Sequence, residues 1–541
     1  MAIMPSREYW QALLSKKSPA ILVLAVLVGL AIRVPGMDRS LGHDEAFTLE
    51  AFASQPYARI ATSYAAPNNH IFHSLLVRLS TRSLGKDNWT ARLPALAAGV
   101  ISIPVIWAVG RALCGTSAVG LIAAWILALI PVHQHYSKTS RGYSLLMLLA
   151  LLSLWAAQSG VRQGRRRSWA AFGICSFLMA WTIPSGIFHL LALTLWAVLL
   201  TSGPSRRPPL LAGLLSGTLV LLAYVPVWQE LASAGQRWGV DIWQDPLALV
   251  GVFQQAVEGW IGGWSGLLPA IAALAGLVGM TRNHRQTGLY IVLSWGVACA
   301  AGLAMGVAGQ PRTYFFLLPT FVLAAAYGLC RTLSVNRWRV IATTALLAGY
   351  GWLGARTLSD TPQRDPFADL AAHLEVSTQV GDIVVTPSIM DVRIWSHARD
   401  TIGQRLLDAL QSQGVHRLLF VTSTADDRFG LGNYLLKTNA APSSIALPEE
   451  HFESLRDLDH IRVWQLRSTG VPIFATNEQS SWHAQVTNSG QELSISNEAS
   501  VIGNSLTIEV LNPNRTPFQL YSSATFATAK PGIVLLVYAK T

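Results

Sequence analysis

The sequence predicts a polytopic α-helical membrane protein that carries a large water-exposed domain at its C-terminal end. Hydrophobic residues make up 51% of the 541 residues and charged residues only 13%, about half the quarter that is usual in soluble domains. The mean hydropathy of the whole chain is +0.37, which requires long apolar segments. This composition excludes a disordered chain, a collagen-like chain and a disulfide-rich secreted scaffold.

Eleven apolar runs approach the length that crosses a bilayer as a helix, about 20 residues. They begin near residues 19, 93, 116, 143, 168, 186, 209, 264, 289, 314 and 338. The first run, 19–34, is short enough to be a signal peptide, but no small-x-small cleavage site follows it. We therefore expect it to be a membrane anchor. The prediction is about eleven transmembrane helices within residues 1–355.

Basic residues in the short loops orient these helices. One set of loops holds most of them: Lys16, Lys17, Arg111, Arg162, Arg165, Arg166, Arg167, Arg206, Arg207, Arg282, Arg285, Arg337 and Arg339. The opposite loops hold few: Lys138, Arg141, Arg237 and Arg312. Because excess Lys and Arg mark the cytoplasmic side, we expect the N-terminus inside and residues 356–541 outside. The net charge of +11 then reflects membrane topology and implies no nucleic-acid partner.

The first outer loop, about residues 36–91, contains a segment with helical periodicity. Residues 69–80 place Ile71, Leu75, Leu76 and Leu79 at helical spacing, together with His73 and Arg78. The segment is too short and too polar to span a bilayer. We predict an amphipathic helix that lies in the membrane interface with its apolar face toward lipid.

The second outer loop, about residues 229–262, is rich in tryptophan. It holds Trp238, Trp243 and Trp260, with Trp264 just beyond. The favoured interpretation is an aromatic belt at the level of the lipid headgroups. A platform that stacks on a sugar ring is the alternative.

The third outer segment, residues 356–541, is soluble in character. We predict a helix at 366–375, a buried strand at 382–386, a helix at 403–413 and another buried strand at 415–421. Alternation of helix and short apolar strand indicates a small α/β unit. The tail from about residue 480 alternates Val and Ile with polar residues, which predicts additional β structure.

Two adjacent acidic residues follow the first helix. Asp44 and Glu45, preceded by His43, stand at the outer mouth of the predicted bundle, where carboxylates are costly to desolvate and are usually retained for function. A carboxylate there could act as a general base toward an acceptor hydroxyl. Alternatively, Asp44 caps the first turn of a surface helix and Glu45 follows the helix dipole. Spacing alone leaves both interpretations open.

A second polar motif leads into the predicted interfacial helix. Asn68, Asn69 and His70 could cap that helix, ligate a metal or hold a substrate hydroxyl. Capping by Asn68 or Asn69 is the favoured structural interpretation.

Two arginines lie at the outer ends of predicted transmembrane helices. Arg141 begins the fourth predicted helix and Arg312 the tenth; each could clamp a phosphate in bidentate fashion or extend to the lipid headgroups. His133 and His135 could bind a metal, but the sequence identifies no partner ligand.

Together these motifs resemble the GT-C superfamily of integral-membrane glycosyltransferases, in its protein-O-mannosyltransferase and aminoarabinose-transferase (PMT-like, ArnT-like) type. The resemblance covers most of residues 20–355. It consists of the acidic pair at the start of the first outer loop and four further matches: Asn69-His70, the stretch from Ala91 to Leu96, the segment from Tyr136 to Arg141-Gly142-Tyr143, and Arg312 to Tyr314 leading to Pro319.

The resemblance implies an inverting enzyme that moves a monosaccharide from a polyprenyl-phosphate donor to an acceptor hydroxyl at the outer membrane surface. It implies Asp44 as the catalytic base, with Glu45 beside it, and Arg141 and Arg312 as the donor-phosphate ligands. The residues expected to line the donor or acceptor sugar are His43, Asn69, His70 and Tyr143.

The expected partners are the lipid-linked sugar donor, membrane lipids and an acceptor that is a lipid, a protein or a glycan. The expected location is a bacterial inner membrane, with the C-terminal domain extracytoplasmic. Many relatives carry His-Pro-Pro or Lys-Pro-Pro before the interfacial helix, whereas this chain has Asn69 to Phe72, so we assign no metal ligands. No cofactor is certain, and a divalent metal stays open.

Other classes of function remain as alternatives. They are an oligosaccharide or phospho-group transferase that uses a lipid carrier, a lipid-sugar flippase or secondary transporter, and a receptor or scaffold that works through its outer domain. The sequence contains no Gly-x-x-x-x-Gly-Lys-Ser/Thr phosphate loop, which argues against ATP-driven transport by this chain.

Overall fold

The computed structural model describes residues 7–64, 66–261, 267–331, 336–359 and 366–377, together with nine strands, β3–β11, between residues 382 and 537. Its contacts group the chain into two compact units. The first, which we call the helical unit, contains residues 1–39 and 56–361. The second unit contains residues 40–55 and 362–541.

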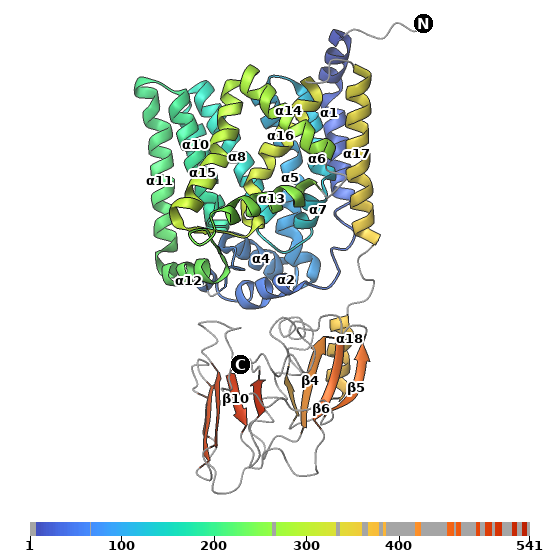
Figure 1. The fold of residues 1–541 in the computed structure, drawn as a ribbon, viewed down its shortest axis with the longest axis vertical. Coiled ribbons are helices and arrows are strands. Elements are labelled where there is room, and N and C mark those ends of the chain that lie inside the picture. Colours follow the sequence, from blue (N-terminus) through green and yellow to red (C-terminus); the bar gives the residue numbers. More distant parts are fainter. Residues whose placement is uncertain are drawn as a thin grey trace. The chain divides into compact units, whose positions relative to one another are not determined.

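A helix coincides with each of the eleven apolar runs. These helices stand side by side as a bundle (Figure 1). They are α1 (Arg7–Ala31), α5 (Asn88–Cys114), α6 (Ser117–Leu129), α8 (Tyr143–Gln163), α9 (Arg166–Thr182), α10 (Gly186–Leu200), α11 (Arg207–Tyr224), α14 (Leu267–Asn283), α15 (Arg285–Met305), α16 (Leu318–Arg331) and α17 (Asn336–Ser359).

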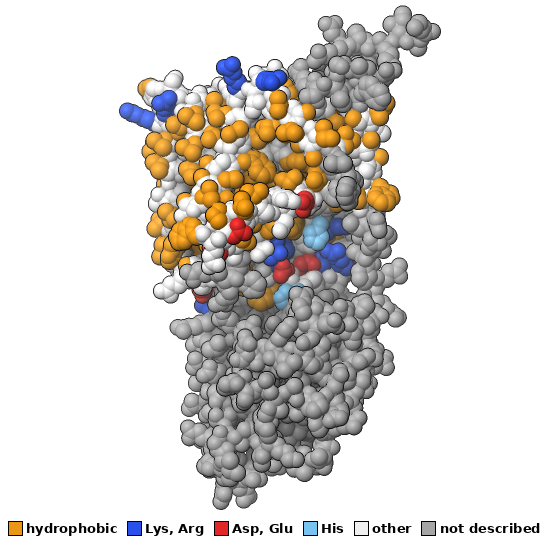
Figure 2. All heavy atoms as spheres, viewed as in Figure 1, with side chains coloured by type: hydrophobic (Ala, Val, Ile, Leu, Met, Phe, Trp, Pro, Cys, Tyr) orange, Lys and Arg blue, Asp and Glu red, His pale blue; other side chains and the backbone are white. Residues whose placement is uncertain are grey.

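Several of these helices meet the requirements of a membrane span. Among the described residues, five segments are long and apolar enough, namely Asn88–Cys114, Tyr143–Gln163, Gly203–Gly235, Arg285–Met305 and Pro311–Cys330. Helices α6 and α7 (Pro131–Ser137) make a sixth if they are one span, bent by 63°. Figure 2 shows the matching surface, a broad band of hydrophobic side chains with Lys and Arg at its upper edge. The protein is therefore polytopic and membrane-embedded, and the number of eleven spans stays a prediction.

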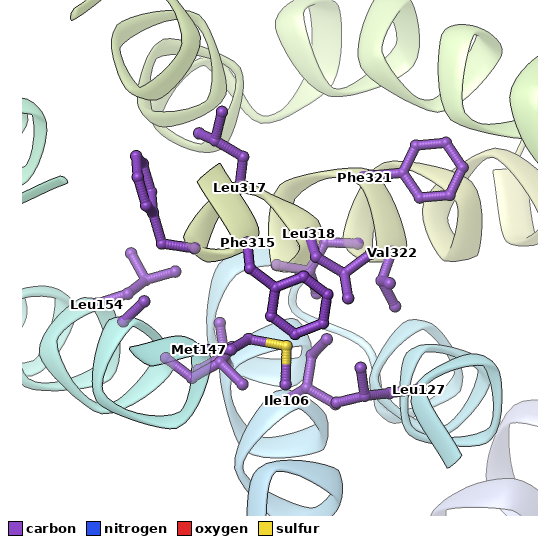
Figure 3. Close-up of a cluster of buried hydrophobic side chains, with 14 of the residues drawn as sticks. Ile106, Leu127, Met147, Leu154, Phe315, Leu317, Leu318, Phe321 and Val322 are labelled. Atoms are coloured by element: carbon purple, nitrogen blue, oxygen red, sulfur yellow. The ribbon is translucent and has the colours of Figure 1, made fainter. Parts of the chain in front are cut away.

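The bundle core is built from apolar side chains of α5, α6, α8 and α16. In Figure 3 the ring of Phe315 points toward Met147 and Ile106, and all three side chains are buried. Phe315 belongs to η5 (Pro311–Leu317), the short 3₁₀ segment that leads into α16. Through Phe315 this core fixes the chain that follows Arg312, and through Met147 it includes α8.

Short elements connect the long helices: α3 (Tyr57–Ala61), α4 (Ile71–Leu84), α12 (Trp228–Trp238), α13 (Leu247–Ile261), η2 (Gly203–Arg206), η3 (Val225–Val227) and the antiparallel pair β1 (Val240–Asp241) and β2 (Val307–Ala308). Helices α4 and α12 lie across the same end of the bundle (Figure 1). Helix α4 matches the helix predicted at 69–80, but its expected lipid-facing side is only partly correct. Leu79 is 53% exposed, whereas Ile71 is completely buried.

The second outer loop is largely helical, since it contains α12 and α13. The predicted aromatic belt is wrong for Trp260, whose side chain is 2% exposed. Its ring packs 5.9 Å from that of Trp295 and 6.1 Å from that of Phe321, centroid to centroid. Trp243 is 75% exposed, as a belt residue would be. Trp264 and the side chain of Trp238 lie outside the described residues.

The second unit contains α2 (His43–Phe47), the π-helix η1 (Thr48–Ala53), α18 (Pro366–Ser377) and three sheets. The strand orders are β3-β4-β6-β5, β7-β8-β9 and β10-β11. The strands are β3 (Asp382–Val385), β4 (Arg417–Ser423), β5 (Phe452–Leu458), β6 (Ile461–Leu466), β7 (His483–Val486), β8 (Leu493–Ala499), β9 (Asn504–Val510), β10 (Ser522–Phe526) and β11 (Ile533–Val537).

These elements coincide with much of the secondary structure predicted for the C-terminal region. Strands β3 and β4 match the two predicted buried strands and pair in parallel, as an α/β unit requires. Helix α18 matches the predicted helix at 366–375, and β7–β11 lie in the tail for which β structure is expected. The helix predicted at 403–413 lies outside the described residues. That residues 356–541 form a separate extracytoplasmic domain stays a prediction.

Candidate functional site

The candidate site of the helical unit is built around the turn between α7 and α8. Helix α7 ends at Ser137 and α8 begins at Tyr143. Arg141 therefore lies in the turn and not in the first turn of the helix as predicted. Its backbone N–H donates to the carbonyl of Thr139 at 2.7 Å, which tightens the turn and directs the Arg141 side chain inward.

Arg141 is a buried cation. Its side chain is 4% exposed, so the alternative that it extends to lipid headgroups is wrong. Its Nη2 donates to the hydroxyl of Tyr143 at 3.3 Å, and its guanidinium carbon lies 5.6 Å from the centroid of the same ring. The structure thus brings together two residues that the sequence assigned separately to the donor phosphate and to the sugar.

His70 contacts the same turn from the start of α4. The backbone N–H of Gly142 donates to His70 Nδ1 at 2.8 Å, and the His70 ring meets Tyr143 edge to face at 4.9 Å between centroids. Because a backbone N–H can only donate, Nδ1 is the unprotonated nitrogen and a neutral His70 carries its proton on Nε2. Burial, followed by the charges of Arg141, His73 and Arg312, holds the pKa of His70 well below its usual value. His70 is therefore a neutral hydrogen-bond donor at pH 7.

Arg312 acts electrostatically on this same His70, although it comes from a distant part of the sequence. It lies in η5, with an exposed side chain. The next residue is fixed from α10, because the hydroxyl of Ser185 donates to the carbonyl of Thr313 at 2.6 Å. Two guanidinium groups, Arg141 and Arg312, thus influence one neutral imidazole. This arrangement favours an anion such as a phosphate.

Asn69 fastens the chain that precedes His70. Its side-chain amide donates to the carbonyl of Ile60 at 2.9 Å and to that of Ser63 at 2.6 Å, and the residue is completely buried. The predicted capping role is wrong, because His70 occupies the N-cap position of α4 and makes no side-chain capping bond. The expected contact between Asn69 and a substrate stays a prediction, whereas its observed contacts position His70.

Two residues of this site were not assigned from the sequence. His73 lies one turn after His70 and is completely buried, and neither ring nitrogen has a hydrogen-bond partner among the described residues. Burial and the charge of Arg141 lower its pKa to about 3. Tyr64 is 4% exposed, and burial and Tyr143 raise its pKa while Arg141 lowers it. The signal for His73 was present, since an i, i+3 pair of histidines shares one helix face.

The possibility that His133 and His135 bind a metal together gains no support from the described residues. His133 is completely buried, and its Nδ1 lies 2.9 Å from Nη2 of Arg33, a cation that excludes a metal ion from that nitrogen. His135 is exposed. Within the described ranges, no group of three or more His, Cys, Asp or Glu residues could hold a metal ion. The open question of a divalent metal is therefore not answered by these side chains.

The acidic pair lies in the second unit, on α2. The N–H of Gly42 donates to Glu45 Oε2 at 3.0 Å, and the N–H of Glu45 donates back to the carbonyl of Gly42 at 3.0 Å. Glu45 therefore closes the first turn and is 4% exposed. Gly42 is the N-cap, so the alternative that Asp44 caps this helix is wrong. The Asp44 side chain is half-buried, as is that of His43.

Comparison with known proteins identifies the fold. Residues 68–229, which include Asn69, His70, Arg141 and Tyr143, match the family model described as dolichyl-phosphate-mannose-protein mannosyltransferase. No curated protein sequence matches the chain. The apo structure of ArnT from Cupriavidus metallidurans is 14% identical, with a TM-score of 0.52, over 83% of this chain and 98% of that one.

Two further solved structures are similar. ArnT from the same organism bound to undecaprenyl phosphate is 13% identical over 84% of this chain and 99% of that one, with a TM-score of 0.52. The Archaeoglobus fulgidus oligosaccharyltransferase in complex with Zn and sulfate is 11% identical over 92% of this chain and 76% of that one, with a TM-score of 0.50. The chain has the fold of the GT-C glycosyltransferases, of the ArnT-like and PMT-like type, as the sequence predicted.

Proposed function

We propose that this protein transfers a monosaccharide from a polyprenyl-phosphate donor to an acceptor hydroxyl at the outer membrane surface, with inversion at the anomeric carbon. The observation that carries the proposal is the burial of Arg141 against Tyr143, with Arg312 acting on the neighbouring His70. A lipid-linked donor is supported by the family match and by the undecaprenyl phosphate bound to ArnT.

The donor phosphate would be held by Arg141 and Arg312. A guanidinium in a site of low dielectric interacts with phosphate more strongly than one in water, and Arg141 is buried. Neutral His70 offers its Nε2–H as an additional donor without adding charge. The hydroxyl of Tyr143, which already accepts from Arg141, can donate its own proton to a phosphate or sugar oxygen.

In the proposed reaction Asp44 is the general base. Its carboxylate takes the proton of the acceptor hydroxyl, the acceptor oxygen bonds to the anomeric carbon, and the bond from that carbon to the phosphate oxygen breaks. Polyprenyl phosphate leaves with the electron pair, and the arginines stabilise its developing charge. We assign the base to Asp44 and not to Glu45, because Glu45 already uses a carboxylate oxygen to close α2.

The matched pair Asp44→Asn and Glu45→Gln tests this assignment. Loss of a positioned base typically lowers the rate about 10²–10⁴-fold, so we expect that loss of kcat in Asp44→Asn, with donor binding retained. Glu45→Gln keeps an oxygen that can accept from Gly42 and should keep most of the activity. Transfer at a near-normal rate by purified Asp44→Asn would contradict the proposed role.

The products distinguish the competing lipid-carrier reactions. Monosaccharide transfer releases polyprenyl phosphate and a glycosylated acceptor, whereas phospho-group transfer leaves a phosphate on the acceptor. An oligosaccharide transferase requires a lipid-linked oligosaccharide donor, and a flippase moves the donor without consuming it. Mass analysis of reactions with each lipid donor in proteoliposomes therefore separates the four activities. The extracytoplasmic location of the C-terminal region is part of the proposal.

A further inference from the structure

The end of the bundle that lies opposite to the candidate site carries a group of arginines. Helix α8 begins at Tyr143, beside Arg141, and contains 21 residues, so its other end lies about 30 Å away. At that end, six exposed arginines belong to the α8–α9 connection, the start of α9 and the start of α11. They are Arg162, Arg165, Arg166, Arg167, Arg206 and Arg207, and we call them the arginine cluster.

Helices α9 and α11 bring these arginines together, because they run in parallel and start at nearly the same level. Two hydroxyls of α11 donate to carbonyls of α9, Ser216 to Gly173 and Tyr224 to Ala180, each at 3.0 Å. Since both contacts follow the same order along the two helices, the helices run in the same direction. Helix α9 begins seven residues before Gly173 and α11 nine residues before Ser216. The two helix starts therefore differ in height by only about 3 Å.

This part of the chain contains no acidic residue that could neutralise the cluster. The sequence has no Asp or Glu from residue 88 to residue 229, a stretch that includes all of α5 to α11. Membrane orientation requires an excess of Lys and Arg, but acidic residues contribute little to it and need not be absent. Helix stability favours acidic side chains in the first turn, and neither α9 nor α11 has one there. Orientation and helix stability therefore do not account for the composition of this cluster.

An exposed apolar surface lies next to the arginines, in the first turns of α11. Four side chains of these turns are 44–64% exposed, namely those of Leu210, Leu211, Leu214 and Leu215. The loops above them are open, because a Cβ atom on Gly164 or Gly203 would meet no described atom within 4 Å. Figure 2 shows the same order on the helical unit, with Lys and Arg at the upper edge of the hydrophobic band. Charge and apolar surface thus follow each other as phosphate and acyl chains do in a phospholipid.

We propose that the arginine cluster and the exposed leucines of α11 bind an anionic phospholipid, in the leaflet opposite to the candidate site. The acyl chains lie along the leucines. The phosphate contacts guanidinium groups from both helix starts, and each guanidinium can donate two hydrogen bonds to it. Basic clusters directly beyond the end of a membrane helix suit anionic headgroups. This inference goes beyond the proposed transfer reaction and does not depend on it.

Titration of the full-length protein in detergent with phosphatidylglycerol, followed by native mass spectrometry, measures the binding. Arg166→Gln/Arg207→Gln removes one arginine from each helix start, and Arg166→Lys/Arg207→Lys keeps both charges. The matched control is Arg111→Gln/Arg282→Gln, which removes two exposed arginines near the ends of α5 and α14. An arginine near an anionic headgroup contributes about fivefold to binding. We therefore expect Arg166→Gln/Arg207→Gln to weaken phosphatidylglycerol binding about 25-fold, and the lysine variant and the control to bind nearly as the wild type does.

Phosphatidylcholine with the same acyl chains separates the contribution of charge from that of the chains. The wild type should bind phosphatidylglycerol more tightly than phosphatidylcholine, and Arg166→Gln/Arg207→Gln should bind the two lipids with similar affinity. Equal binding of both lipids by the wild type would refute the proposal. Equal loss of phosphatidylglycerol binding in Arg166→Gln/Arg207→Gln and in the Arg111→Gln/Arg282→Gln control would also refute it, because the effect would then belong to the whole surface and not to this cluster.

Two other phosphates test the nature and the place of the ligand. Glycerol phosphate has the charge but no acyl chains and should not displace phosphatidylglycerol; displacement at equal concentration would mean that the cluster binds a soluble anion and not a lipid. Geranyl phosphate, a short polyprenyl phosphate, reports on the donor site. Arg141→Gln should weaken geranyl phosphate binding and leave phosphatidylglycerol binding unchanged, and equal loss of both would contradict a separate site. Because these are equilibrium measurements, a failure of sugar transfer would refute the proposed function without affecting them.

Discussion

Substitution of Gly142 by alanine should disturb the candidate site directly. A Cβ atom at this position would lie 2.9 Å from Cβ and 3.0 Å from Nδ1 of His70, and 2.8 Å from Cγ2 of Thr182. These distances are well inside van der Waals contact, so His70 or the turn must move. Overpacking of this kind costs about 1–3 kcal/mol, and loss of the bond from Gly142 N–H to His70 Nδ1 adds about 1 kcal/mol.

The expected total for Gly142→Ala is therefore a loss of about 2–4 kcal/mol of stability, or a displaced His70 if the site relaxes instead. Thermal unfolding in detergent micelles measures the first outcome, and the Kd for geranyl phosphate measures the second. Gly217→Ala is the matched control, because a Cβ on this α11 residue meets nothing within 4 Å. If the two variants have the same melting temperature and the same Kd, the close contact between Gly142 and His70 is wrong.

Three further outcomes follow from the buried polar groups. His70→Asn keeps an acceptor near the Nδ1 position but loses the hydrogen-bond donor Nε2–H, so it should weaken binding of the lipid-linked sugar donor. His70→Gln should restore part of that binding. Equal Kd values of the two variants for the sugar donor would contradict the assigned tautomer. Because the pKa values of His70 and His73 are lowered, the unfolded chain binds more protons below about pH 6.5. The melting temperature should therefore fall as the pH drops below about 6.5, and it should fall less steeply in His73→Phe. If the melting temperatures of the wild type and His73→Phe fall equally with pH, the lowered pKa of His73 does not contribute. Arg33→Met should lower the free energy of unfolding by about 2–4 kcal/mol, because it leaves helix-end carbonyls unpaired. The control Arg111→Met, at an exposed site, should lower it by about 0.5–1 kcal/mol. Equal losses of stability would refute a structural role for Arg33.

The long helices could be predicted from composition, because apolar side chains are favoured both in contact with lipid and inside the bundle. Each predicted run has a helix, and two of the breaks between helices fall at a glycine. Gly115 (φ +69°) directly follows α5, and Gly164 (φ +64°) directly follows α8; both have the left-handed conformation that glycine adopts at little cost. Lengths of single helices were less predictable, since neighbours decide where an apolar chain stops.

The side chains of the loops were harder to predict. Residue type alone identified Arg141, His70 and Tyr143, but it could not show that Asn69 points back toward Ile60 and Ser63 and not into the site. An amide satisfies the same hydrogen bonds with a helix end, a loop carbonyl or a sugar hydroxyl. Only the path of the chain decides between them. The prediction that Trp260 belongs to an aromatic belt failed for a similar reason, because aromatic rings are suited to both the membrane interface and the protein core.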